Sequence, residues 1–394
     1  MNNPEFKPAQ QLLPNEAYYE TTWYQNEQNR LFAEAWVFAC AADRVQKPGD
    51  FVTLRFMDFS LFVLRGADGL LRGFHNLCRH RGCEVLEDSG NTGANVVCPY
   101  HRWAYTSEGA LRALPNAEAC FPDLDKSELS LLPAAVGEHG GLVYINPSPT
   151  PRDSFESWIA NMDDFAWPHC LTDGSLSYQG EVVYEMQCNW KVFYENAIDG
   201  YHLGYLHDQT LGKLYPDANI WRRAGRNVVW YSTERDGAPQ SNSILSAQIA
   251  DGYGAQRLPG HEEAPYPGVV MLFPLTILSP SPWGFYVSVL EPKGPERTDM
   301  RTYSWAPAGS AGRFNIGERV EPVRLVDLQE HPLETGNFQI EDMWIVEKIQ
   351  RNVRSPKFSI GPLAQGAGAE SPITHFQESV LEYLNTEPTQ EPRA

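Results

Sequence analysis

Residues 189–207 have the sequence N-W-K-V-F-Y-E-N-A-I-D-G-Y-H-L-G-Y-L-H and decide how the rest of the chain is interpreted. Asp199, His202 and His207 fall within nine residues of one another. On a helix, Asp199 and His202 would share a face, whereas His207 would lie about 140° further round than His202. Both imidazoles can therefore reach one centre only if the helix loosens or ends between them, and Gly204 lies where that can happen.

Two neutral imidazoles and a carboxylate from elsewhere in the chain would form a facial triad. Such a triad suits non-haem Fe(II), because it leaves positions open for O2 and substrate. The alternative is an amphipathic core helix with two histidines satisfied by hydrogen bonds, since structural groups can imitate functional clusters. This stretch alone leaves both interpretations open.

The composition is that of an ordinary globular protein of 394 residues, with 42% hydrophobic residues. Its net charge of −19 argues against nucleic acid or an anionic membrane as a partner. No segment is apolar for long enough to span a bilayer, and the first ten residues lack the features of a signal peptide. Seven irregularly spaced cysteines do not form a disulfide framework, so we expect a cytoplasmic, reducing location.

The first part of the chain predicts an arm, one helix and a β-rich module. Residues 1–25 show little periodicity, and Glu27–Trp36 has apolar residues at helical spacing. Residues of about 40–150 form an all-β module rich in turns, which ends near Pro147–Pro151. Its expected strands are Phe51–Phe56, Ser60–Arg65, Leu70–His75 and Gly140–Asn146.

The second part predicts an α+β architecture, a long β-meander with helices against one face. The expected strands are Tyr178–Cys188, Val228–Glu234, Val269–Ser279, Phe285–Glu291 and Arg301–Trp305. The expected helices, besides the stretch quoted first, are Ser154–Phe165, Glu341–Arg354 and Thr374–Leu384.

A second constellation of metal-binding residue types lies inside the β module. Cys78 and His80 occur in C-R-H-R-G-C, and Cys98 and His101 occur in C-P-Y-H-R-W, with seventeen residues between His80 and Cys98. Zinc is the alternative occupant, but zinc fingers favour separate pairs of cysteines and of histidines. Two Cys-His pairs suit a [2Fe–2S] cluster in which one iron is held by two thiolates and the other by two imidazoles.

With both patterns present, the chain resembles the catalytic α subunit of a Rieske non-haem iron oxygenase, in the aromatic-ring-hydroxylating dioxygenase family. Cys-x-His-x17-Cys-x2-His is the family's Rieske pattern, and Asp-x2-His-x4-His is its mononuclear iron pattern. The resemblance implies an all-β Rieske [2Fe–2S] domain at residues 40–155. It also implies a helix-grip (START-like) catalytic domain with a long antiparallel sheet at residues 156–394, and an N-terminal arm and helix (1–39) packing on that domain.

The resemblance also implies a third iron ligand far downstream. Asp342, in E-D-M-W-I-V-E-K-I-Q, matches the Asp-x4-Glu-x2-Gln form of many members. Glu341 is the neighbour most easily confused with Asp342, and a helix carrying Glu341, Asp342 and Glu347 is also typical of a solvated face.

Asp199 is implied to be a bridge rather than a ligand. In the family, this carboxylate hydrogen-bonds an iron-ligating histidine, here His202, and a Rieske histidine of the neighbouring subunit, here His101. Such a head-to-tail contact closes into a ring, so a homotrimer is expected, and a β subunit is compatible but not required. The alternative is that Asp199 is a helix carboxylate that only forms a salt bridge.

Two departures from family patterns concern Cys83 and Asn196. Some Rieske proteins have an additional disulfide, but Tyr100 occupies the place of the partner that Cys83 would need. The Glu195-Asn196 pair lies one residue nearer to Asp199 than in naphthalene-type members, so the role of the pocket asparagine does not transfer directly to Asn196.

Electrons must come from another protein, because no Gly-x-Gly-x-x-Gly follows a strand and no plant-type ferredoxin cysteine run occurs. We expect an NAD(P)H-dependent reductase, with or without a ferredoxin, and O2 and a small organic molecule as substrates. The other function classes are a Rieske electron-transfer protein without oxygenase activity and a zinc-stabilised binding protein.

The substrate is the least defined feature. Asp-Gly-Tyr-His at 199–202 resembles benzoate-type and cumate-type dioxygenases, which favours hydroxylation of an aromatic acid. The alternative is a monooxygenase acting on a quaternary ammonium or betaine-type compound, because Gly361–Glu382 with P-I-T-H-F-Q resembles such demethylases. Arg222 and Arg223 could hold a carboxylate. Candidate pocket residues are Asn196, Ala197, Leu203, Leu206, Leu211, Phe273 and Trp283.

Overall fold

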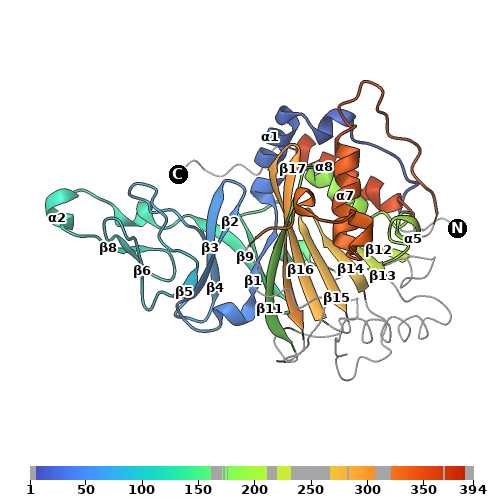
Figure 1. The fold of residues 1–394 in the computed structure, drawn as a ribbon. Coiled ribbons are helices and arrows are strands. Elements are labelled where there is room, and N and C mark those ends of the chain that lie inside the picture. The colour runs from blue at the N-terminus through green and yellow to red at the C-terminus, as the bar shows by residue number, and fades with distance from the viewer. Residues whose placement is uncertain are drawn as a thin grey trace. The chain divides into compact units, whose positions relative to one another are not determined.

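The computed structural model describes residues 6–160, 171, 174, 176–210, 220–231, 267–281, 284–306, 321–366 and 369–386. The chain divides into two compact units, each described here by itself (Figure 1). The larger unit contains Trp158–Glu387 and the N-terminal residues up to Leu31, and the smaller unit contains Phe32–Ser157. No helix within the described ranges is long and apolar enough to cross a bilayer.

The smaller unit is built on a seven-stranded sheet with the order β1-β10-β9-β4-β3-β2-β5 and a three-stranded sheet with the order β6-β7-β8. The predicted strands Phe51–Phe56, Ser60–Arg65 and Leu70–His75 are confirmed to within one residue. The strands are β1 (Val37–Ala41), β2 (Asp50–Phe56), β3 (Phe59–Arg65), β4 (Leu71–His75), β5 (Ser89–Asn91), β6 (Val96–Val97), β7 (Ala104–Tyr105), β8 (Leu111–Ala113), β9 (Pro133–His139) and β10 (Leu142–Asn146). The short α2 (Ala117–Cys120) follows β8.

The start of the chain differs from the predicted helix Glu27–Trp36. The helix α1 spans Thr21–Arg30, and a single 3-10 turn, Phe32–Glu34, leads into β1. All five residues of β1 are buried, and the strand pairs antiparallel with β10. The apolar run at residues 31–36 therefore has helical spacing but forms only a 3-10 turn, and the chain then continues as the edge strand β1, because tertiary pairing outweighs weak local preference.

The larger unit contains a seven-stranded antiparallel sheet with the order β11-β17-β16-β15-β14-β13-β12. The strands are β11 (Ser177–Met186), β12 (Ile220–Ala224), β13 (Asn227–Tyr231), β14 (Pro267–Leu272), β15 (Thr276–Ser281), β16 (Gly284–Gly294) and β17 (Arg297–Ala306). The predicted single strand Val269–Ser279 is wrong, because the chain turns at Phe273–Leu275 and forms a hairpin. Pro274 is the signal for this turn, since proline cannot donate a hydrogen bond within a sheet.

The helices of this unit are α1, α3 (Phe155–Trp158, which begins in the smaller unit and ends at the boundary), α4 (Trp190–Ala197), α5 (Leu203–Leu206), α7 (Phe338–Gln350) and α8 (Ser371–Asn385). In Figure 1, α7 and α8 lie against the long sheet, as the resemblance implied. Phe376 and Tyr383 of α8 contact the ring of Phe273 at centroid distances of 6.2 and 5.8 Å. The mixed α+β fold with a long antiparallel sheet is therefore confirmed.

The stretch 189–207 is two short helices separated by a turn. The side chain of Asn189 accepts a hydrogen bond from the backbone of Lys191 and begins α4, which ends at Ala197. The backbone N–H of Tyr201 then donates to Asp199 Oδ1, a local bond that favours a turn over helix. His202 and His207 flank α5 at its two ends. The helix is interrupted before His202, and α5 then ends at Leu206, so a helix end does lie between the two histidines, as expected, but not at Gly204.

Candidate metal centres

The two Cys-His loops of the smaller unit have the same backbone geometry. Four residues after each cysteine, Gly82 (φ 71°) and Arg102 (φ 60°) adopt the left-handed conformation, and their N–H groups donate to the carbonyls of Cys78 and Cys98. The N–H of Cys78 donates to Cys83 O at 2.8 Å, and the N–H of Cys98 donates to Trp103 O at 2.9 Å. The loops therefore present their ligands as a matched pair.

The thiols and the imidazoles occupy different environments at this site. Cys78 and Cys98 are buried in an apolar cluster, whereas His80 and His101 are half-exposed. The Nδ1 atoms of the two histidines lie 3.1 Å apart, and His80 stacks on Trp103 with ring centroids 4.9 Å apart. Two thiolates inside and two imidazoles outside match the donor set of a Rieske cluster.

Neighbouring groups orient these ligands. The hydroxyl of Tyr105 lies 3.3 Å from Cys78 Sγ, accepts a hydrogen bond from the N–H of Arg79 at 3.0 Å, and can donate its own proton to an ionised sulfur. Burial raises the pKa of Cys78, and a bound metal would be needed to keep this thiol ionised. Cys83 is free among the described cysteines, and its thiol donates to Glu84 O at 3.3 Å.

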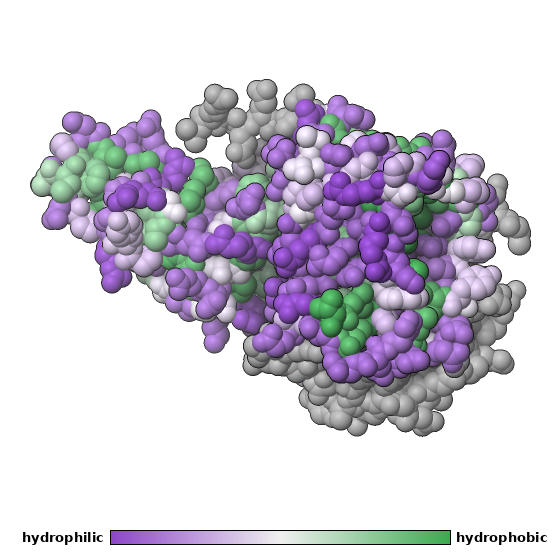
Figure 2. Space-filling model, turned by 45° about the horizontal axis from the view of Figure 1, so that its top comes forward, coloured by the Kyte–Doolittle hydropathy of each residue, from purple (hydrophilic) through white to green (hydrophobic). Residues whose placement is uncertain are grey.

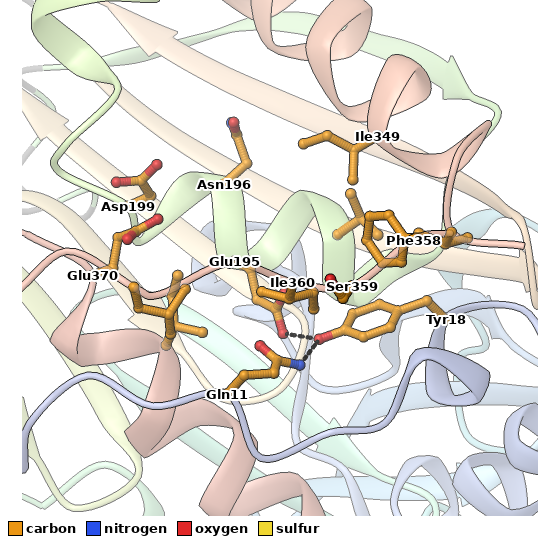
Figure 3. A pocket seen from close by; sticks show the side chains of 15 residues that line it. Gln11, Tyr18, Glu195, Asn196, Asp199, Ile349, Phe358, Ser359, Ile360 and Glu370 are labelled. Carbon is orange, nitrogen blue, oxygen red and sulfur yellow. Dashed lines mark hydrogen bonds between the residues drawn. The ribbon is translucent and has the colours of Figure 1, made fainter. Parts of the chain in front are cut away.

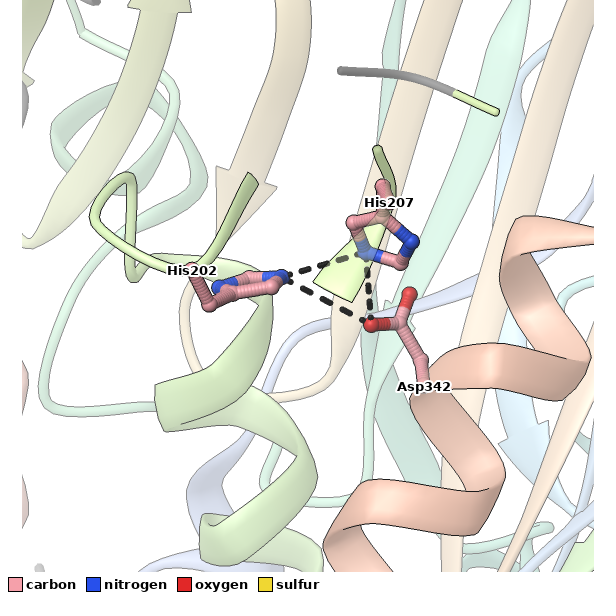
Figure 4. Close-up of side chains that lie close together, drawn as sticks. All are labelled: His202, His207 and Asp342. Carbon is pink, nitrogen blue, oxygen red and sulfur yellow. Dashed lines mark hydrogen bonds and ion pairs between the residues drawn. The ribbon is translucent and has the colours of Figure 1, made fainter. Parts of the chain in front are cut away.

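The larger unit brings His202, His207 and Asp342 together (Figure 4). The two Nε2 atoms lie 3.2 Å apart. Asp342 Oδ1 lies 3.1 Å from His207 Nε2 and 3.7 Å from His202 Nε2. Ligands about 2.1 Å from one ion and at right angles would be separated by about 3.0 Å, so the three atoms fit one face of an octahedral metal ion.

The charges at this site favour an ionised carboxylate. Burial alone would lower the pKa of His202, but the carboxylates of Asp199 and Asp342 outweigh it and raise the pKa to about 10. Burial alone would raise the pKa of Asp342, but the neighbouring imidazoles of His202 and His207 hold it well below its usual range. A divalent cation would take the place of the proton that the three ligands share.

A further polar group contacts each of the three candidate ligands. Asp199 Oδ2 lies 3.2 Å from His202 Nδ1, and Glu341 Oε2 lies 2.6 Å from His207 Nδ1. Asn196 donates from Nδ2 to Asp342 Oδ1 at 2.8 Å. Such outer partners fix the orientation and tautomer of metal ligands.

These contacts distinguish Asp342 from Glu341, which the sequence left open as alternative third ligands. Asp342 Oδ1 points between the two histidines, whereas Glu341 accepts hydrogen bonds from His207 and from Thr210 Oγ1 (2.7 Å). Glu341 is buried and is neither the ligand nor part of a solvated face. Asn196, a candidate pocket residue, donates a hydrogen bond to a candidate ligand and also lines a cavity alongside α4. The sequence carried no signal that Glu341 would contact His207 or that Asn196 would contact Asp342, apart from the nearness of Glu341 to Asp342 and of Asn196 to Asp199 in the chain.

The other predicted pocket residues are dispersed. Leu203 and Leu206 lie on α5 between the two histidines, and Ala197 ends α4. Phe273 is buried against α8, which explains its apolar character by core packing. Arg222 and Arg223 lie on β12. Leu211 and Trp283 lie outside the described residues.

Two family models match the chain. Residues 174–386 match the ring hydroxylating alpha subunit (catalytic domain), and residues 35–129 match the Rieske [2Fe-2S] domain.

Among curated relatives, the glycine betaine monooxygenase oxygenase subunit of Chromohalobacter salexigens is 24% identical over 95% of this chain and 87% of its own length. The carnitine monooxygenase oxygenase subunit of Escherichia coli is 28% identical over 92% of this chain and 91% of its own length.

Solved structures share the fold. The quaternary ammonium Rieske monooxygenase CntA in complex with an inhibitor has a TM-score of 0.71 and 22% identity, covering 97% of this chain and 96% of that chain. A naphthalene 1,2-dioxygenase variant bound to phenanthrene has a TM-score of 0.70 and 19% identity, covering 98% and 96% of the two chains. The fold is thus common to enzymes that act on unlike substrates, and it does not by itself separate them.

Proposed function

The chain belongs to the Rieske non-haem iron oxygenase α subunits, and from this membership we propose that it is the oxygenase component of a monooxygenase acting on a quaternary ammonium compound. One observation carries the substrate class. The curated glycine betaine and carnitine monooxygenase subunits match this chain along nearly its whole length. They favour the quaternary ammonium alternative over the aromatic acid that Asp-Gly-Tyr-His suggested.

The two centres supply complementary chemistry in this proposal. Cys78, His80, Cys98 and His101 would hold a [2Fe–2S] cluster, which would supply single electrons, and His202, His207 and Asp342 would hold a ferrous ion, which would supply the site for O2. The three candidate ligand atoms lie 3.1–3.7 Å apart and would all contact such an ion from one side. A separate NAD(P)H-dependent reductase supplies the electrons, directly or through a ferredoxin.

The test of this function is O2 uptake by the iron-loaded protein with a reductase and NADH. We expect uptake with at least one member of a panel of glycine betaine, carnitine, γ-butyrobetaine and choline, with one atom of 18O2 in the product. Benzoate and cumate serve as controls of the aromatic class. Uptake and product formation with the aromatic acids alone would overturn the substrate class while leaving the oxygenase assignment in place.

We further propose that three copies assemble head to tail, with His101 of one copy facing Asp199 of the next. Exposed apolar side chains support the smaller unit's part in this contact. Tyr100, Leu77 and Val97 are 55, 40 and 38% exposed close to the candidate cluster ligands. Figure 2 shows hydrophobic residues at the end of this unit, and a separate hydrophobic patch on the larger unit.

The larger unit offers a matching surface. Tyr201 and Tyr205 are 57 and 74% exposed and their rings contact each other 5.6 Å apart, next to Asp199 in the chain. Exposed aromatic residues of this kind are typical of protein interfaces. An interface between copies would bury these rings and place a Rieske histidine at Asp199.

Asp199→Asn is expected to keep both metals and to slow electron transfer between them by about 10- to 100-fold. The amide retains an acceptor for the N–H of Tyr201, but it loses the negative charge that favours donating imidazoles on either side. The measurement is single-turnover oxidation of the reduced cluster on adding O2 and substrate. Asp208→Asn, an exposed position in the same segment, is the control and should oxidise at the wild-type rate.

Mixed trimers test the assembly. Combining Asp199→Asn chains with His101→Ala chains should restore activity where an intact Asp199 meets an intact His101 of the neighbouring copy. A wild-type rate of cluster oxidation in Asp199→Asn would show that Asp199 does not connect the two centres. No recovery in mixed trimers that are shown to be assembled would count against transfer between subunits.

A further inference from the structure

A cavity of about 310 Å³ lies alongside α4 and ends at Asp199 and Asn196 (Figure 3). A water molecule needs about 30 Å³, so the cavity can hold several. Three carboxylates face it, and none of the side chains that line it is basic. Its lining consists of Gln11, Tyr18, Val192, Glu195, Asn196, Asp199, Ile349, Val353, Phe358, Ser359, Ile360, Gly361, Leu363, Glu370 and Ile373.

Glu195 lines this cavity between Asp199 and Tyr18 (Figure 3), in an asymmetric set of hydrogen bonds. Tyr18 Oη and Gln377 Nε2 both donate to Oε1, each at 2.8 Å. Gln11 Nε2 in turn donates to Tyr18 Oη at 3.0 Å. The described residues provide no hydrogen-bond partner for Oε2, so a proton can reside on that oxygen without displacing a bond.

The charged groups around Glu195 leave it without a cation of its own. Lys191, one turn earlier on α4, is fully buried, and its Nζ lies 2.5 Å from Glu27 Oε1 of α1. Glu370, just before α8, faces the same cavity and adds negative potential. Burial raises the pKa of Glu195 to about 7, outweighing the hydrogen bonds from Gln377 and Tyr18 and the charge of Lys191.

We propose that Glu195 is the residue that stores protons for the oxygenase, and that the cavity carries them by water to its Asp199 end beside the iron ligands. The inference rests on the proposed function. Monooxygenation converts a substrate C–H bond and O2 into C–OH and water, and it consumes two electrons and two protons. The reductase supplies the electrons, and Glu195 passes on protons that solvent replaces. Glu195 does not touch the reacting atoms.

The first test does not depend on turnover. Infrared spectroscopy of the full-length, iron-loaded protein should show a carboxylic acid C=O band that disappears as the pH rises through about 7. The band should be absent in Glu195→Gln and present in Glu378→Gln, the same substitution at a side chain on α8 that pairs with Lys7 at the surface. If the wild-type band persists in Glu195→Gln, the protonated carboxyl is not Glu195, and the proposal that it stores protons is wrong.

The second test uses the pH dependence of O2 uptake. The acid form of Glu195 is the donor, so the wild-type rate should fall as the pH rises through about 7. Glu195→Gln should lower the rate below that pH by about tenfold and remove this fall, while iron content and Tm stay the same. Glu195→Asp should restore part of the rate. An unchanged rate and pH profile in Glu195→Gln would overturn the inference.

Tyr18→Phe provides an independent variant that leaves the carboxyl in place. It removes one donor to the ionised form, so the fall in rate should move to higher pH. A purely structural role for Tyr18 would lower Tm without moving the profile. No O2 uptake by the wild-type protein with any substrate would refute the proposed function, and the infrared titration would still decide whether Glu195 holds a proton.

Discussion

Asp342→Ala is expected to leave the protein brown with its cluster intact, to remove the second iron and to reduce turnover by at least about 1,000-fold. The side chain supplies one of three donor atoms that lie 3.1–3.7 Å apart, and two imidazoles alone leave the ion without a charged ligand. The measurement is iron per protein against acid-labile sulfide, together with substrate-dependent O2 uptake.

Glu341→Gln is the matched control for this prediction. The amide oxygen can still accept the hydrogen bond from His207 Nδ1, so the iron should be retained with affinity or activity lowered by about 10- to 100-fold. Normal iron content in Asp342→Ala, with loss of iron in Glu341→Gln, would show that Glu341 and not Asp342 is the carboxylate ligand.

Cys98→Ala is expected to abolish the visible spectrum of the cluster and all electron transfer from the reductase. Each loop supplies one thiolate and one imidazole, and the folding of such a site is coupled to its metal. His101→Ala should have the same outcome, because its Nδ1, 3.1 Å from His80 Nδ1, is one of the four proposed ligand atoms. The measurement is the absorption and electron paramagnetic resonance spectrum of the reduced protein.

Cys120→Ala is the control for loss of a cysteine in the same unit. Cys120 is exposed and free, so its removal should leave the spectrum unchanged. A complete [2Fe–2S] spectrum in Cys98→Ala would show that the ligand set is wrong. Retention of the second iron in both cluster variants would show that the two centres fold independently.

The fold was predicted best where the signal is local. Strands bounded by glycine turns, such as Phe51–Phe56 and Ser60–Arg65, lie within one residue of β2 and β3. The errors occur where local and tertiary preferences differ. The first helix ends at Arg30 and not at Trp36, because the chain then leads into β1, which pairs with β10, and Val269–Ser279 folds back at Pro274. The start of α7 at Phe338, earlier than predicted, depends on Asn337, whose side chain caps the helix.

The sequence by itself determined the chemistry of the two metal centres. Ligand types and spacings within one loop or one short helix are local properties, so Cys78, His80, Cys98, His101, His202 and His207 could be identified from their order in the chain. The backbone follows the same local pattern, because Gly82 and Arg102, each four residues after a cysteine, both adopt the left-handed conformation.

The tertiary structure alone decided which distant side chains complete these centres. Glu341 and Asp342 are adjacent in the chain, yet neighbours on a helix point about 100° apart, and only the packing of α7 against α4 shows which one faces both histidines. The contacts of Asn196 with Asp342 and of Glu195 with Tyr18 and Gln377 join residues 146, 177 and 182 positions apart. No periodicity or spacing encodes such contacts, because they depend on how separate elements pack.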